Sequence, residues 1–95
     1  MDDGADNRYR IVLSCDGVPA DAGAQAAVDI QEEFVHRPWH ENVECFWNGA
    51  SLVLTAENEY DAHGLALMDE FSDAIAASIA DSFDGRIRLV SITKR

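Results

Sequence analysis

The three histidines and the carboxylates near them are the side chains best suited to metal or acid–base chemistry. His36 and His40 lie on either side of Pro38, whereas His63 follows three acidic residues: Glu57, Glu59 and Asp61. Imidazole and carboxylate groups together can bind zinc or a similar metal, or exchange protons with a substrate. Pro38 breaks the helical spacing of the first two histidines, and the pattern matches no metal-ligand motif. We therefore expect no metal or other cofactor. A small-molecule or metal-binding domain at this histidine end, with or without catalysis, is the alternative function.

The two cysteines, Cys15 and Cys45, belong to no CxxC pattern. They are too few for a disulfide framework. Cys15 precedes a predicted helix, where a thiolate can be stabilised, but it alternates with Ile11 and Leu13 and so belongs to the core side of its strand. We predict two buried free thiols with no disulfide between them, and we assign no catalytic residue. The sequence favours a protein that is not an enzyme.

The chain is strongly acidic, because 18 Asp and Glu against 7 Lys and Arg among 95 residues give a net charge of −11. This charge disfavours nucleic acid and anionic membranes as partners. Hydrophobic residues form 47% of the chain, which is enough for a folded core. Residues 1–7 are acidic and unlike a secretory signal, so we expect a disordered tail before a single domain at 8–95, in the cytoplasm.

Hydrophobic periodicity predicts four strands and two helices. In chain order they are strand 8–15, helix 20–37, strand 42–47, strand 50–55, helix 59–82 and strand 86–93. Pro38 is expected to end the first helix at Arg37, because the residue before a proline avoids helical geometry. Asn58 and Asp61 resemble the capping pattern of a helix start. In the last strand, alternation places Ile92 on the same side as Val90.

Asn48 and Gly49 lie between two apolar runs and predict a hairpin with a two-residue turn. This turn gives three apolar pairs that face the core: Trp47 with Ala50, Cys45 with Leu52, and Val43 with Leu54. Because side chains alternate along a strand, Phe46 and Val53 then belong to the opposite side of the hairpin.

The order of elements, βαββαβ, indicates a ferredoxin-like α+β fold, that is, an α/β sandwich. We expect a four-stranded antiparallel sheet in the order 4-1-3-2, with two helices on one face. Many unrelated functions share this architecture, so the fold does not identify an activity.

The side of the sheet without helices is the most informative candidate site. Alternation assigns to it arginine, aromatic and β-branched residues: Arg8, Arg10, Val12, Phe46, Val53, Arg86, Arg88 and Val90. Such a mixture is typical of protein interfaces. We therefore expect a binding or regulatory module that contacts a protein partner through this face, including self-association. Arg10→Glu or Val12→Asp is expected to weaken the contact without unfolding the domain.

Three alternatives compete with this hypothesis. The arginines can simply pair with Glu44, with Glu57 or with the acidic tail at 1–7. The face can bind single-stranded RNA, although Phe46 is its only aromatic residue and the net charge is unfavourable. The acidic outer faces of the two helices can neutralise a basic partner, as in a decoy or immunity protein.

Overall fold

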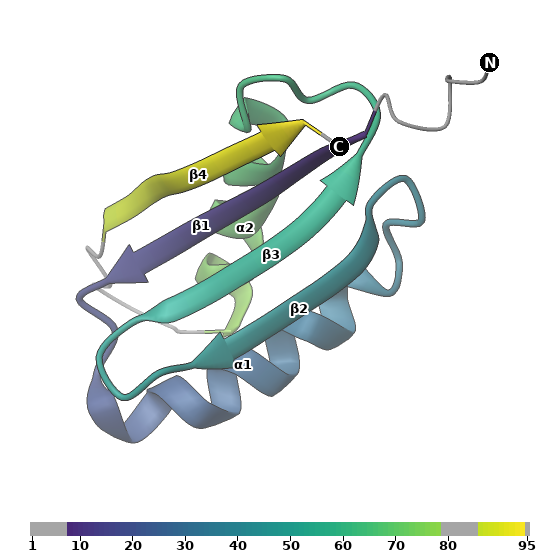
Figure 1. Cartoon of the computed structure of the whole chain (residues 1–95). Helices are drawn as coiled ribbons and strands as arrows, with labels where there is room; N and C mark the ends of the chain where they lie inside the picture. Colours follow the sequence, from purple (N-terminus) through teal and green to yellow (C-terminus); the bar gives the residue numbers. More distant parts are fainter. Residues whose placement is uncertain (1–7, 79–85, 95) are drawn as a thin grey trace, which may run out of the picture.

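The computed structural model of the chain describes residues 8–78 and 86–94, which form one sheet with two helices (Figure 1). In chain order the elements are β1 (Tyr9–Asp16), α1 (Ala20–Phe34), β2 (Glu41–Trp47), β3 (Leu52–Asn58), α2 (Leu65–Ser78) and β4 (Arg86–Lys94). The predicted βαββαβ order is confirmed. Two predictions lie outside the described residues: the disordered tail at 1–7 and the end of the second helix at 79–82.

All neighbouring strands are antiparallel, and the strand order is β2-β3-β1-β4, as predicted. Both helices lie on the same side of the sheet (Figure 1). The architecture is a ferredoxin-like α+β fold. We call the other side of the sheet the open face, because no described helix covers it. Neither described helix has the length and apolar character that crossing a bilayer requires.

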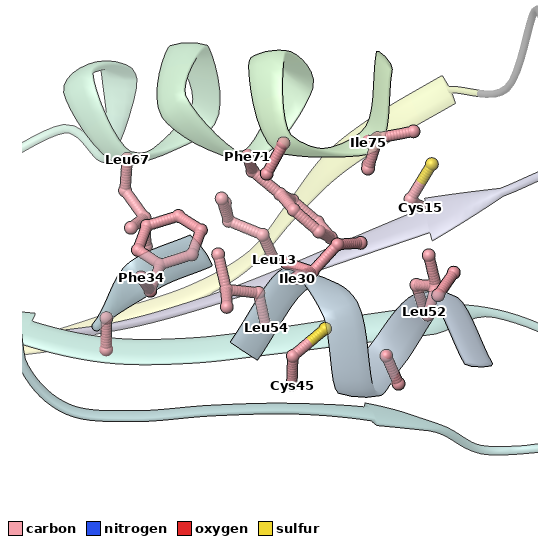
Figure 2. Close-up of a cluster of buried hydrophobic side chains, with 14 of the residues drawn as sticks. Leu13, Cys15, Ile30, Phe34, Cys45, Leu52, Leu54, Leu67, Phe71 and Ile75 are labelled. Carbon is pink, nitrogen blue, oxygen red and sulfur yellow. The ribbon is translucent and has the colours of Figure 1, made fainter. Parts of the chain in front are cut away.

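The core fills the space between the helices and the inner side of the sheet (Figure 2). Ile11, Leu13 and Cys15 of β1 alternate along the strand and have no exposed surface. Figure 2 shows the side chains that α2 directs toward them: Leu67, Phe71 and Ile75. At the edge of the core the indole of Trp47 lies directly against Gly23 of α1, where a Cβ atom would overlap the ring.

The β2–β3 hairpin differs from the prediction, because its loop has four residues, 48–51, rather than two. Trp47 pairs with Leu52, and Cys45 pairs with Leu54. The register is therefore shifted by two residues, and a shift by an even number keeps the same side chains in the core.

The side chain of Asn48 explains the wider loop. Its Oδ1 accepts hydrogen bonds from the N–H groups of Ala50 and Ser51, at 2.9 and 2.8 Å. The N–H group of Asn48 donates to the carbonyl of Ser51. Asparagine thus organises the turn through its amide oxygen, and Gly49 adopts a φ of +97° within it.

The first helix ends at Phe34, three residues before the predicted end at Arg37. The N–H groups of Val35, His36 and Arg37 each bond to the carbonyl three residues earlier rather than four. The chain therefore tightens into a 3₁₀-type turn before Pro38, which is a common way to satisfy the last carbonyls of a helix.

The second helix begins at Leu65 rather than at Glu59. Asn58 does act as a capping residue, but its Oδ1 accepts two N–H groups of the turn that follows β3. The carboxylate of Asp61 then accepts two N–H groups from the first turn of α2, at 3.2 and 2.9 Å. Two successive caps thus replace the single predicted helix start.

A bulge in β4 also changes the prediction. Leu13 of β1 pairs with Leu89, and the adjacent Val12 pairs with Ser91. Val90 is therefore an extra residue in β4 with no partner in β1. An extra residue reverses the alternation beyond it. Ile92 consequently pairs with Ile11 and packs against the core, whereas simple alternation placed Ile92 on the open face.

Candidate functional site

The open face is organised in rows that run across the strands, because the pairing register places one residue from each strand side by side. From β2 to β4 the rows are Phe46–Val53–Ser14–Arg88, Glu44–Thr55–Val12–Ser91 and Glu41–Glu57–Arg10–Thr93. Most of the predicted contact residues stand in these rows. The remaining ones lie at the margin: Arg8 just before β1, Arg86 opposite Asp16, and Val90 at the bulge.

One apolar residue from each strand forms a diagonal band across the open face: Phe46, Val53, Val12 and Val90. We call it the apolar band. Phe46 is 46% exposed and Val90 is 54% exposed, whereas the two central valines are partly buried. Between them lie the small side chains of Ser14 and Thr55, which are buried. Side chains at the centre of the face therefore protrude little from the sheet, and the largest apolar side chain, that of Phe46, lies on the β2 side.

Glu57 is a buried carboxylate in this face, with 1% of its side chain exposed. Its Oε2 accepts a hydrogen bond from Arg10 Nη1 at 3.2 Å, and its Oε1 accepts one from Asn42 Nδ2 at 3.0 Å. Arg8 Nη1 lies 3.8 Å from the same carboxylate and 3.0 Å from Glu41. Two guanidinium groups therefore compensate the desolvation of Glu57. The alternative in which arginines pair within the sheet is confirmed for this carboxylate.

The contact between Arg10 and Glu57 changes what Arg10→Glu is expected to do. A glutamate there would bring a second carboxylate beside a buried one, which is destabilising. Arg10→Glu is therefore expected to destabilise the domain as well as to change the contact surface, so it does not test the contact alone. Phe46 and Arg88 are better probes of the face, since neither of them is a partner of the buried carboxylate of Glu57.

Asp16 ends β1 and holds the arginine at the other end of the face. Its Oδ1 accepts a hydrogen bond from Ser51 Oγ at 2.6 Å, and its Oδ2 accepts one from Arg88 Nε at 3.0 Å. The Ser51 hydroxyl, and then the Arg88 guanidinium, hold the pKa of Asp16 below its usual value. The side chain of Arg88 remains 60% exposed and is oriented by this contact.

Charge is separated across the open face. The β2 side exposes Glu41 and Glu44, and the β4 side exposes Arg86 and Arg88. Glu44 and Arg86 form no ion pair with any other described residue. We call these the acidic side and the arginine side. The apolar band runs from one to the other.

His40 is buried where the loop after α1 meets α2, and its side chain has no exposed surface. Nδ1 of the ring lies 3.2 Å from Asn58 Nδ2. Nε2 lies 3.2 Å from Glu70 Oε2, at an angle outside hydrogen-bond geometry. Tyr60 stacks on the ring with a centroid separation of 6.2 Å. These contacts give His40 a role in packing the loop onto the helix.

The other two histidines, His36 and His63, are exposed. His36 lines an open groove beside the end of α2, together with three acidic residues of α1: Asp29, Glu32 and Glu33. Within residues 8–78 and 86–94, no group of three or more His, Cys, Asp and Glu side chains is arranged to hold a metal ion. The three histidines singled out in the sequence are thus not assembled into one site in this part of the chain.

Both cysteines are buried and unpaired with each other, as predicted. Burial, reinforced by the charge of Asp16, raises the pKa of Cys15 to about 11. Burial, reinforced by the neighbouring Cys15, raises the pKa of Cys45 to about 12. Both groups therefore remain thiols near neutral pH, and thiols are much weaker nucleophiles than thiolates.

The sequence did not single out the exposed aromatic pair Trp39 and Tyr60, which are 50% and 53% exposed. The Trp39 indole Nε1 donates to both carboxylate oxygens of Glu70, at 3.3 and 3.2 Å. Arg37 Nε lies 3.1 Å from the same carboxylate. The sequence did contain one indication of an exposed aromatic residue here. A tryptophan follows Pro38 in a segment that shows neither helical nor strand periodicity.

Comparison with protein-family models, with curated proteins and with solved structures found no match for this chain. Function is therefore inferred from the arrangement of the open face.

Proposed function

We propose that this chain is a small acidic binding module of the cytoplasm, without catalytic activity, and that it contacts a protein partner through the open face. The observation that carries the proposal is the apolar band. Phe46, nearly half exposed, stands in one row with Val53, and the band continues through Val12 and Val90 across all four strands. Contiguous exposed apolar surface on a small domain is characteristic of contact surfaces.

The surroundings of the band support a protein partner over nucleic acid. Arginine beside aromatic and β-branched residues is the composition of interface centres. An RNA-binding sheet would need further aromatic residues on the central strands, where this chain has Val12 and buried Ser14. The net charge of −11 also repels a phosphate backbone.

The proposal is tested with two serine variants of matched exposure. Phe46→Ser removes the largest exposed apolar side chain of the open face, and Val28→Ser removes an apolar side chain that is 52% exposed on α1. Each immobilised protein is incubated with extract of its own cells, and retained proteins are identified by mass spectrometry. We expect a protein retained by the parent and by Val28→Ser but lost with Phe46→Ser. If all three retain the same proteins, the open face is not the contact surface.

A further inference from the structure

We propose that the partner of the open face is a second copy of this chain, related to the first by a two-fold axis that runs parallel to the strands. The axis lies between β3 and β1, in the plane between the two facing sheets. This inference rests on the proposed function, because it names the protein that the open face contacts. Two-fold dimers with the same surface on both subunits are the commonest protein oligomers.

The separated charges decide the direction of the axis. When two sheets meet face to face, an axis along the strands places β2 of one copy opposite β4 of the other. In the row register, Glu44 of one copy then comes opposite Ser91 of the other, one row from Arg88, and this approach of opposite charges occurs twice. An axis across the strands would instead place β2 opposite β2 and set like charges against each other. Like charges across an interface are costly, so the first arrangement is favoured.

The centre of the face is complementary to itself under the same axis. In the row register, Val53 of one copy comes opposite Ser14 of the other, and Val12 comes opposite Thr55. Val53 therefore meets a small, buried serine that leaves room for it, and Val12 meets Thr55, a buried side chain of about its own size. The strands of two facing sheets usually cross at an angle of about 30°. Rotating one sheet on the other by this angle moves residues near the axis less than residues at the edges, so the contacts between the central side chains persist.

The same row places Phe46 of one copy opposite Arg88 of the other. An arginine stacks on an aromatic ring through its planar guanidinium. Arg88 is already oriented by its hydrogen bond to Asp16, so less conformational entropy is lost when the ring is covered. The cation–aromatic contact occurs on both sides of the axis.

The net charge of each copy does not prevent this arrangement. The acidic helices lie on the other side of each sheet, so they become the outer layers of the dimer (Figure 1). Repulsion between these layers acts across two sheets, and salt at physiological strength screens charges beyond about 8 Å.

Charge reversal tests the axis directly. Glu44→Arg gives residues 44 and 88 the same positive charge, and Arg88→Glu gives them the same negative charge, so in either variant like charges approach each other between the two copies. Sedimentation velocity is measured over a range of concentrations for the parent, for each variant and for an equimolar mixture of the two. We expect the parent to dimerise, each variant alone to lose about tenfold or more in affinity, and the mixture to recover it as a heterodimer. Asp73→Arg, the same charge change as Glu44→Arg on an exposed position of α2, is expected to dimerise like the parent.

Two results would overturn the inference. A parent that remains a monomer at millimolar concentration excludes the second copy, while the comparison of Phe46→Ser with Val28→Ser still decides the proposed function. If Glu44→Arg and Arg88→Glu each dimerise as well as the parent, self-association occurs through another surface. Thermal melting shows whether each variant is folded, and Arg86→Glu replaces Arg88→Glu if the contact with Asp16 proves necessary for folding.

Discussion

The guanidinium of Arg10 lies 3.2 Å from the carboxylate of Glu57, whose side chain is almost fully buried although no described helix covers that face. The long side chains of the sheet themselves exclude water from this carboxylate. Arg10 therefore has a structural role in addition to its place on the proposed contact surface.

Arg10→Ala is expected to lower the free energy of unfolding by about 1–2 kcal/mol, because a hydrogen-bonded charged partner of Glu57 is lost. The loss stays below that of a fully broken buried pair, since Arg8 and Asn42 still contact the carboxylate. Urea denaturation measures the change. Arg86→Ala, at an exposed position, is the control and should change stability by less than about 0.5 kcal/mol. Equal stability of the two variants would contradict a structural role for Arg10.

Gly23→Ala is expected to destabilise the protein because the added Cβ would overlap the indole of Trp47. Overpacking costs about 1–3 kcal/mol, and the better helix propensity of alanine returns at most about 1 kcal/mol. In a Trp47→Leu background the indole is absent, so Gly23→Ala should leave the free energy of unfolding unchanged or increase it. This change of sign, measured in a double-mutant cycle by urea denaturation, is the test. A stabilising effect in the parent background would show that the indole does not lie against this glycine.

The core could be predicted from hydrophobic alternation, which Ile11, Leu13 and Cys15 display clearly. The strand order could be predicted because the βαββαβ order of elements indicates one particular fold. The hairpin register could not be predicted, because the amide of Asn48 organises a four-residue loop in place of the turn expected for Asn-Gly. The bulge at Val90 was also missed, since alternation along one strand does not show an extra residue relative to its neighbour.

The site was predicted less completely than the fold. Alternation assigned residues to the open face, but only the register shows that acidic and arginine residues occupy opposite sides of it. The burial of Glu57 depends on Arg8 and Arg10 at the start of the chain's first strand and on Asn42 of another strand, which no local pattern reveals. The histidines had suitable chemistry, but His40 is used for packing.

The two thiols are expected to make stability fall at high pH. Folding raises the pKa of Cys15 and Cys45 from 9.0 to about 11 and about 12, so the folded state retains protons that the unfolded state releases. Their contribution is fully present below pH 9 and is lost as the pH rises toward 11 and 12. Urea denaturation as a function of pH measures this slope, which Cys45→Ala should reduce.

The same burial predicts that a thiol reagent at pH 8 modifies neither cysteine in the native protein and both in urea. Rapid modification of Cys15 without denaturant would contradict the burial of this thiol.

His40 is expected to carry its proton on Nε2 when the ring is neutral. The amide oxygen of Asn58 accepts two backbone N–H groups, at 3.1 and 2.8 Å, so its Nδ2 is the group that faces the ring. Because an amide nitrogen donates, Nδ1 of His40 must accept, which leaves the proton on Nε2, on the side of Glu70. Long-range ¹H–¹⁵N spectra distinguish the two tautomers, and the exposed His36 and His63 serve as references in the same spectrum. Asn58→Asp replaces the donor by an acceptor and should move a proton to Nδ1. Finding the proton on Nδ1 in the parent would reverse the assigned orientation of the amide.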